Sequence, residues 1–160
     1  MAHTSPGIDG TAQDRGALTQ EEQAMWRALG RVVQRLPRQL DDAMMRSTGL
    51  TMTEFSVLHV LHEAQDQTLR MSDLATSTGL SISRVSRVAL AMEGRGWCER
   101  RRDEEDGRSA LASLTPAGVS EVQRAKTHYS DIARQHVLDR VPAESLHVLA
   151  EALAAIASRP

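Results

Sequence analysis

Residues 78–94 read TGLSISRVSRVALAMEG, the pattern of a tight turn followed by an amphipathic helix. Gly79 suits a turn position that needs a positive φ, and the Ser81 hydroxyl can cap a helix that begins at residue 82. A shorter helical segment, residues 73–77, precedes the turn and has Ser72 as its expected cap. Two helices joined by a short glycine turn predict a helix-turn-helix unit. Its second helix is expected to bury the apolar residues Ile82, Val85, Val88, Ala89 and Met92.

The other side of this second helix carries hydroxyl and guanidinium groups, and no acid occurs in the helix before Glu93. Arginine forks fit guanine edges and phosphates, and serine hydroxyls can bond to either without filling the groove. A solvated helix face has a similar composition, but the turn before this helix and the extended segment after it favour DNA. The residues expected to contact the major groove are Ser81, Ser83, Arg84, Ser86 and Arg87.

The segment after the helix has the period of a β-hairpin. Side chains alternate along residues 97–102, and a second extended run covers residues 109–114. Between them lies a charged tip. Arg108, next to this tip, can reach a minor groove, where negative potential is concentrated, and Asp106 can orient its guanidinium group. The alternative is a charged tip that only keeps the hairpin soluble.

Long helical patterns flank this winged unit on both sides. Apolar residues recur every three or four positions along residues 21–47, 117–138 and 143–158. Their apolar stripes exceed what one winged domain can cover, so these helices need a partner. The predicted fold is mainly α with a small β-hairpin. It comprises a flexible leader over residues 1–20, dimerisation helices over residues 21–48 and 116–158, and a winged helix-turn-helix domain over residues 51–115.

Composition narrows the functional classes. The chain has 160 residues and a net charge of −2, which excludes bulk-basic, histone-like binding of nucleic acid but not a local basic face. The single cysteine excludes an internal disulfide and a cysteine-rich metal site, and suits the reducing cytoplasm. No apolar run is long enough to cross a membrane. The sequence contains no His-Glu-x-x-His, glycine-rich phosphate loop or nucleophile elbow, so we expect neither an enzyme nor a bound cofactor.

The motifs from residue 26 to residue 156 resemble those of the MarR (multiple antibiotic resistance regulator) family of winged-helix repressors. The resemblance is carried most specifically by Asp106-Gly107-Arg108 followed by Leu114-Thr115-Pro116-Ala117-Gly118. It also includes Phe55-Ser56-Val57-Leu58, Met71-Ser72-Asp73-Leu74-Ala75, the turn at Gly79, and Glu93-Gly94-Arg95-Gly96-Trp97.

This resemblance implies a transcription regulator, most simply a repressor, that binds double-stranded DNA. It also implies an intertwined homodimer, held together by the first helix and the last two. The two winged domains would occupy successive turns of a pseudo-palindromic operator. Carried over by position, Ser81, Ser83, Arg84 and Arg87 would enter the major groove, and Arg108, oriented by Asp106, the minor groove. A dimer of the same fold that binds a ligand but not DNA is an alternative; an acid at position 84, 87 or 108 would have indicated it, and all three are arginine.

The resemblance also implies release from DNA by a small aromatic acid bound between the dimer helices and the winged domain. Residues expected near such a cleft are Trp26, Arg27, Arg31, His59 and His62, each of which also fits a packing or interface role. Two further sensing modes stay open. His59 and His62 could hold a metal ion with His128 or His136. Cys98 could be oxidised if the three arginines that follow Glu99 lower its pKa, although a small buried apolar side chain is the simpler interpretation.

Overall fold

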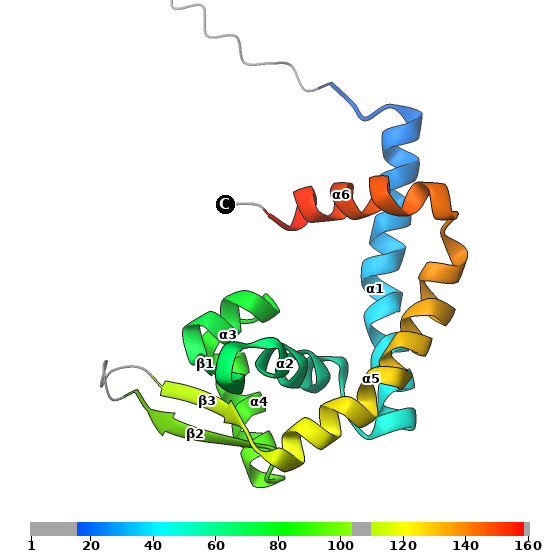
Figure 1. Cartoon of the computed structure of the whole chain (residues 1–160). Helices are drawn as coiled ribbons and strands as arrows, with labels where there is room; N and C mark the ends of the chain where they lie inside the picture. Colours follow the sequence, from blue (N-terminus) through cyan, green and yellow to red (C-terminus); the bar gives the residue numbers. More distant parts are fainter. Residues whose placement is uncertain (1–15, 104–109, 159–160) are drawn as a thin grey trace, which may run out of the picture.

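The computed structural model describes residues 16–103 and 110–158, which form several helices and a small sheet that lies beside the helices Met52–Glu63, Met71–Thr78 and Ile82–Gly94 (Figure 1). The chain begins with a long helix, continues through three shorter helices and a sheet, and ends with two more helices. In order, the elements are α1 (Gln20–Thr48), α2 (Met52–Glu63), η1 (Gln65–Gln67), β1 (Thr68–Arg70), α3 (Met71–Thr78), α4 (Ile82–Gly94), β2 (Cys98–Arg102), β3 (Ala110–Leu114), α5 (Pro116–His136), η2 (Leu138–Arg140), η3 (Ala143–Ser145) and α6 (Leu146–Ala157).

Side-chain caps mark the start of most of the α-helices in the described residues. The Thr51 hydroxyl accepts a hydrogen bond from the Glu54 amide, and the Glu54 carboxylate accepts one from the Thr51 amide, which completes a capping box. Gly49 ends α1 with a φ of 75°. The expected start of α3 is wrong: the helix begins at Met71, without a side-chain cap, and Ser72 lies inside its first turn.

The sheet has three antiparallel strands in the order β1-β3-β2, so the expected hairpin of β2 and β3 is only part of it. β1 pairs with β3 through Thr68 opposite Ser113, and the two hydroxyls lie 2.8 Å apart. A strand of three residues is too short to show an alternating pattern, which is why the sequence indicated only a break in helix there.

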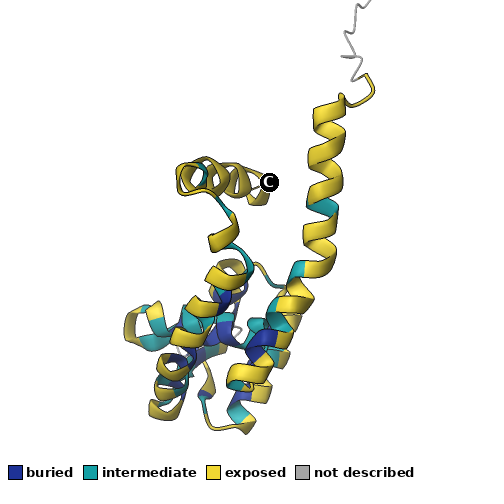
Figure 2. Ribbon diagram, turned by 90° about the vertical axis from the view of Figure 1, so that its right-hand side faces the viewer, coloured by how far each residue is buried: buried dark blue, intermediate teal, exposed yellow. Residues whose placement is uncertain are grey.

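The hydrophobic core lies where α2, α3, α4 and the sheet meet, with contributions from the end of α1 and from α5 (Figure 2). Its largest fully buried side chains include Met44, Leu50, Phe55, Leu58, Leu61, Leu74, Val85 and Met92. In contrast, α6 contains no buried residue, and the buried residues of α1 are Ala43 and Met44, near its end. None of the helices in the described ranges has both the length and the hydrophobicity to span a lipid bilayer.

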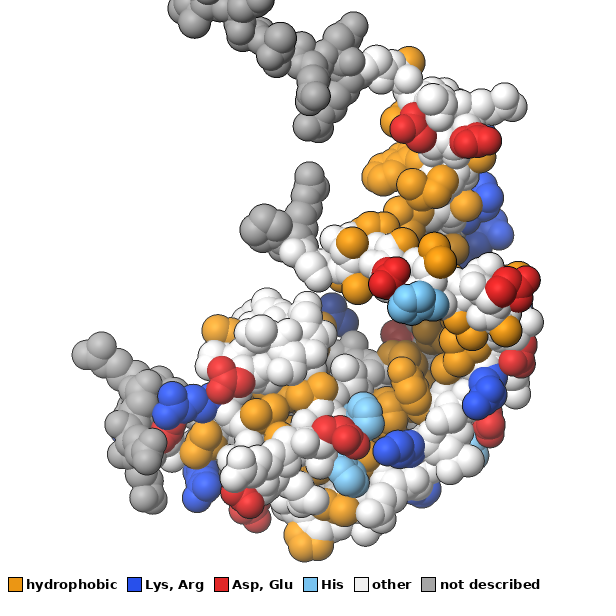
Figure 3. Space-filling view, turned by 45° about the horizontal axis from the view of Figure 1, so that its top comes forward, with side chains coloured by type: hydrophobic (Ala, Val, Ile, Leu, Met, Phe, Trp, Pro, Cys, Tyr) orange, Lys and Arg blue, Asp and Glu red, His pale blue; other side chains and the backbone are white. Residues whose placement is uncertain are grey.

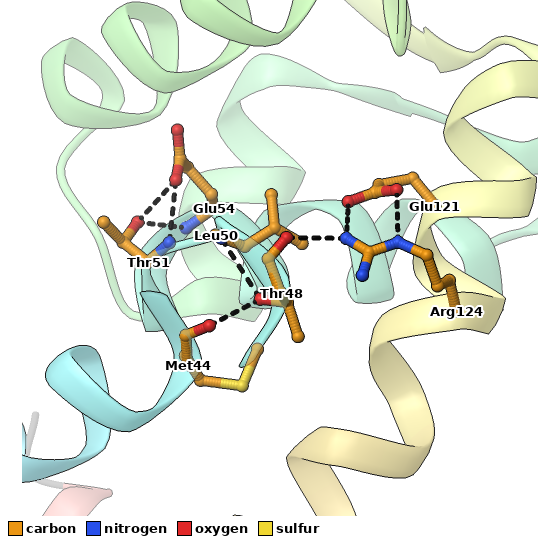
Figure 4. Close-up of polar contacts among 7 residues, drawn as sticks. All are labelled: Met44, Thr48, Leu50, Thr51, Glu54, Glu121 and Arg124. Carbon is orange, nitrogen blue, oxygen red and sulfur yellow. Dashed lines mark hydrogen bonds and ion pairs between the residues drawn. The ribbon is translucent and has the colours of Figure 1, made fainter. Parts of the chain in front are cut away.

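A polar joint ties the corner between α1 and α2 to α5 (Figure 4). The Arg124 guanidinium donates a 2.6 Å hydrogen bond to the Thr48 carbonyl oxygen, which the end of α1 leaves without a helical partner. Glu121 binds the same guanidinium, with 2.9 Å between Arg124 Nε and Glu121 Oε2, and this pairing raises the Arg124 pKa. The joint therefore fixes the long helices against the winged unit.

Candidate nucleic-acid interface

The helix-turn-helix consists of α3, the turn at Gly79 and α4. Gly79 has a φ of 67°, and its amide and that of Leu80 bond back to carbonyl groups in the last turn of α3. The Ser81 hydroxyl accepts a 3.3 Å hydrogen bond from the Arg84 amide, so it caps α4 as the sequence predicts. Val85, Ala89 and Met92 are buried and hold the helix against the core. The opposite face of α4 is thereby left at the surface.

The predicted polar side chains lie on this surface. Ser81, Ser83, Arg84 and Arg87 are exposed, and Ser86 is half-buried. The Arg84 guanidinium donates a 3.3 Å hydrogen bond to the Thr53 hydroxyl at the start of α2. Among the described residues, no carboxylate lies within ion-pair distance of Arg84 or Arg87, so no internal ion pair competes with an anionic partner for them.

One residue of the expected buried face is exposed instead. Ile82, assigned to the core by its spacing, has 57% of its surface accessible. It is the first residue of α4, and the core that covers Val85 and Ala89 does not reach this end of the helix. Helical periodicity indicates the direction of a side chain but not how far the neighbouring elements extend along the helix.

A shallow groove runs beside the two arginines, between the end of α1, the start of α2 and α4. Its volume is about 470 Å³, and it is lined by Asp41, Thr51, Thr53, Glu54, Arg84, Arg87, Val88 and Ala91. Its two acids already have partners. Asp41 accepts a 2.7 Å hydrogen bond from the Met52 amide, and Glu54 is bound by the Thr51 amide and lies 3.6 Å from the Arg95 guanidinium. Sequence analysis did not predict this groove, because its walls come from three separated segments.

The base of the wing is fixed by ion pairs. Glu93, the single acid of α4, accepts hydrogen bonds of 2.7 Å and 2.9 Å from the Arg100 guanidinium, and these bonds lower the Glu93 pKa. Asp103 is only 6% exposed, and one of its carboxylate oxygens lies 2.8 Å from Arg70 Nε, which connects the end of the wing strand to β1. The predicted minor-groove residues, Asp106 and Arg108, lie outside the described residues.

The five predicted effector residues do not come together within one chain. Trp26, Arg27 and Arg31 are exposed on the half of α1 that projects away from the winged unit, whereas His59 and His62 lie on α2 within it (Figures 1 and 2). The His59 ring stacks on Phe55 with 5.5 Å between centroids. Phe55 in turn stacks on Tyr129, so His59 belongs to a packed aromatic column.

The structure shows a different hollow, of about 200 Å³, between α1, α2 and α5. It is lined by Leu40, Met52, Tyr129, Ile132, Ala133, Val137 and Leu138. None of the predicted effector residues lines it, and its lining is apolar apart from the Tyr129 hydroxyl. Sequence analysis missed it because each of these residues also fits an ordinary helix–helix contact.

Neither of the other sensing modes has a site in the described structure. No group of three His, Cys, Asp or Glu side chains suitable for a metal forms within residues 16–103 and 110–158. Cys98 is buried, its thiol donates to the Ala89 carbonyl oxygen at 3.3 Å, and burial raises its pKa to about 11. The lowered pKa that oxidation would require is not found, because desolvation outweighs the charge of Arg100. Cys98 is the small buried side chain of the simpler interpretation.

Comparison with known proteins agrees with this architecture. The model of the MarR family matches residues 50–110. Sco3205, a MarR family transcriptional regulator from Streptomyces coelicolor solved in complex with DNA, is 31% identical with a TM-score of 0.85, over 91% of this chain and 92% of that one. AbsC, another MarR family regulator from the same organism, is 35% identical with a TM-score of 0.80, over 89% and 95% of the two chains.

Among curated proteins, the transcriptional repressor MprA of Escherichia coli is 32% identical over 75 residues. That match covers 47% of this chain but only 43% of the repressor, so it spans less than half of the curated relative. The two Streptomyces structures, in contrast, match through the long helices as well as the winged unit. The chain belongs to the MarR family.

Proposed function

We propose that the protein is a sequence-specific transcription regulator, a repressor, that binds double-stranded DNA in the cytoplasm. The observation that carries this proposal is the outer face of α4, where Arg84 and Arg87 are exposed among serine hydroxyls. The single acid of α4, Glu93, is paired with Arg100 on the wing strand. The DNA complex of Sco3205, which has the same arrangement of elements, supports this use of the fold.

A homodimer accounts for the exposed apolar side chains of α1 and α6. Trp26 is 64% exposed, and apolar side chains are visible along the first half of α1 and over α6 (Figure 3). The large exposed apolar residues of these two helices are Met25, Trp26, Val32, Val33, Met45, Leu146, Val148, Leu149, Leu153 and Ile156. A second copy can cover them by twofold symmetry. The two α4 helices would then read half-sites of a pseudo-palindromic operator about one helical turn apart.

The proposal gives separate roles to residues of α4 and of the wing. Ser81, Ser83, Arg84, Ser86 and Arg87 would contact the major groove. Arg108, oriented by Asp106, would contact the minor groove; both remain part of the proposal on sequence grounds alone.

Replacing Arg87 with alanine tests the proposal. We expect a loss of operator affinity of about 30-fold or more, because one base or phosphate contact contributes about 1–3 kcal/mol and a homodimer loses the contact in both half-sites. The slope of affinity against salt concentration should also fall if a phosphate contact is lost. The measurement is fluorescence anisotropy with the DNA that flanks the protein's own gene.

The matched control is Arg134→Ala, which removes an exposed arginine from the last turn of α5. Equal operator affinity of the Arg87→Ala variant and the wild type would contradict the assignment of α4. A wild type whose DNA affinity does not change with salt would contradict DNA binding itself.

We also propose that a small aromatic acid releases the protein from its operator by occupying the hollow between α1, α2 and α5. The apolar lining suits an aromatic ring, and a carboxylate would have to stay at the mouth, because no charged side chain lines the hollow. Binding there would change how the two copies of the chain lie against each other, and hence the spacing of the two α4 helices.

The test is to fill the hollow with a larger side chain, by replacing Ala133 with phenylalanine. Aromatic carboxylates such as benzoate are expected to raise the melting temperature of the wild type and to leave that of an Ala133→Phe variant unchanged. Ala117→Phe, an exposed position on the same helix outside the hollow, is the matched control and should respond like the wild type. Equal stabilisation of all three proteins would place the binding site elsewhere.

A further inference from the structure

The first turn of α4 presents an exposed apolar side chain next to the polar groups at the start of the helix. Within residues 50–103 and 110–115, Ile82 and Leu90 are the large apolar side chains that are exposed, at 57% and 54%. Isolated apolar residues are common on protein surfaces. Ile82 differs from them in its position, because it is the first residue of the helix whose outer face carries Arg84 and Arg87.

The polar groups around Ile82 are held in place by bonds within the chain. The Ser81 hydroxyl accepts from the Arg84 amide and lies 3.2 Å from the Ser83 hydroxyl. The Arg84 guanidinium is directed towards Thr53 on α2. Ile82, in contrast, has over half its surface free. A partner can therefore contact Ile82 without breaking any of these internal hydrogen bonds.

The chemistry of the surroundings indicates the partner. In a helix-turn-helix, residues at the N-terminal end of the second helix meet the base edges. The apolar group on a major-groove edge is the 5-methyl of thymine. A protein partner would need a contiguous apolar patch, but Ile82 and Leu90 are separated by two helical turns, with Ser86 between them.

We infer that Ile82 is a specificity-determining residue that contacts a thymine methyl group in each half-site of the operator. The inference rests on the proposed function and adds to it a preference that neither the serines nor the arginines of α4 supply. Those side chains favour hydrogen-bonding edges and phosphates. An isoleucine favours thymine over cytosine at the same position because cytosine lacks the methyl group.

Deoxyuridine provides the test, since it differs from thymidine only by that methyl group. Duplexes that bind the full-length wild type are first selected from a random library, and each thymine of the selected site is then replaced by deoxyuridine. At one symmetric pair of positions, the wild type should lose about fourfold in affinity per half-site, or about 15-fold for both. The Ile82→Ala variant should bind both duplexes equally, and Ile82→Val should retain most of the difference.

Leu90→Ala is the matched control, because it truncates the other exposed apolar side chain of the same helix. It should respond to deoxyuridine as the wild type does. Equal responses of the wild type and Ile82→Ala at every thymine would overturn the inference while leaving DNA binding intact. A wild type that selects no common sequence would overturn the proposed function instead.

Discussion

Replacing Gly118 with alanine should destabilise the protein by about 3 kcal/mol or more. A Cβ atom at this position would lie 2.0 Å from the Trp97 carbonyl oxygen, 2.9 Å from its carbon and 3.0 Å from Leu114 Cδ2. The carbonyl cannot retreat freely, because it accepts a 3.1 Å hydrogen bond from the Thr115 amide. The Thr115 hydroxyl, which caps α5, also donates to the Gly96 carbonyl oxygen. The alanine would therefore force the start of α5 away from the root of the wing.

Urea denaturation followed by circular dichroism measures this effect. Gly94→Ala is the control: Gly94 ends α4, has an ordinary φ and has no atom within 4 Å of an added Cβ. This variant should be as stable as the wild type or more stable, by up to about 1 kcal/mol. Similar unfolding free energies for the Gly118→Ala variant and the wild type would mean that the two segments are not packed as closely as described.

Replacing Leu153 with glutamate should produce a folded monomer with little affinity for the operator. Leu153 is exposed within a helix that has no buried residue, so the substitution should not disturb the core of its own chain. In a twofold interface the change occurs twice, and each leucine lost from the interface costs about 1.5–3 kcal/mol. The dimer should weaken roughly 100-fold or more. Operator affinity should fall with it, because two half-sites can no longer be bound together.

Analytical ultracentrifugation gives the oligomeric state, and circular dichroism checks the helix content. Gln65→Glu adds the same charge at an exposed position of η1, away from α1, α5 and α6, and should stay dimeric. If the Leu153→Glu variant were a dimer with full operator affinity, α6 would have no part in the interface. A monomeric wild type would contradict the homodimer itself.

The local chemistry of the sequence predicted most of the fold. Gly79 and Ser81 act through their own backbone neighbours, so a local pattern is enough to predict the turn and the start of α4. The missed features depend on segments that are distant along the chain. β1 exists because it pairs with β3, more than 40 residues later. Ile82 is exposed because the core does not extend beneath the first turn of α4.

The predictions for the candidate site show the same contrast between local and long-range features. The outward residues of α4 follow from a single helix, and the structure places Ser81, Ser83, Arg84 and Arg87 at its surface as predicted. The effector residues were inferred from a family likeness rather than from local pattern. A hollow walled by three helices depends on how those helices cross, which periodicity along each helix cannot give.

The corner between α1 and α2 leaves little room for independent motion. Gly49 caps one helix and Thr51 caps the next, so only Leu50, which is fully buried, separates the two caps. Arg124 clamps the same corner from α5. The long helices and the winged unit thus form one rigid body, with α4 at the end far from the start of α1 (Figure 1). A small rotation near the symmetry axis would reach the operator as a larger displacement, without any element having to unfold.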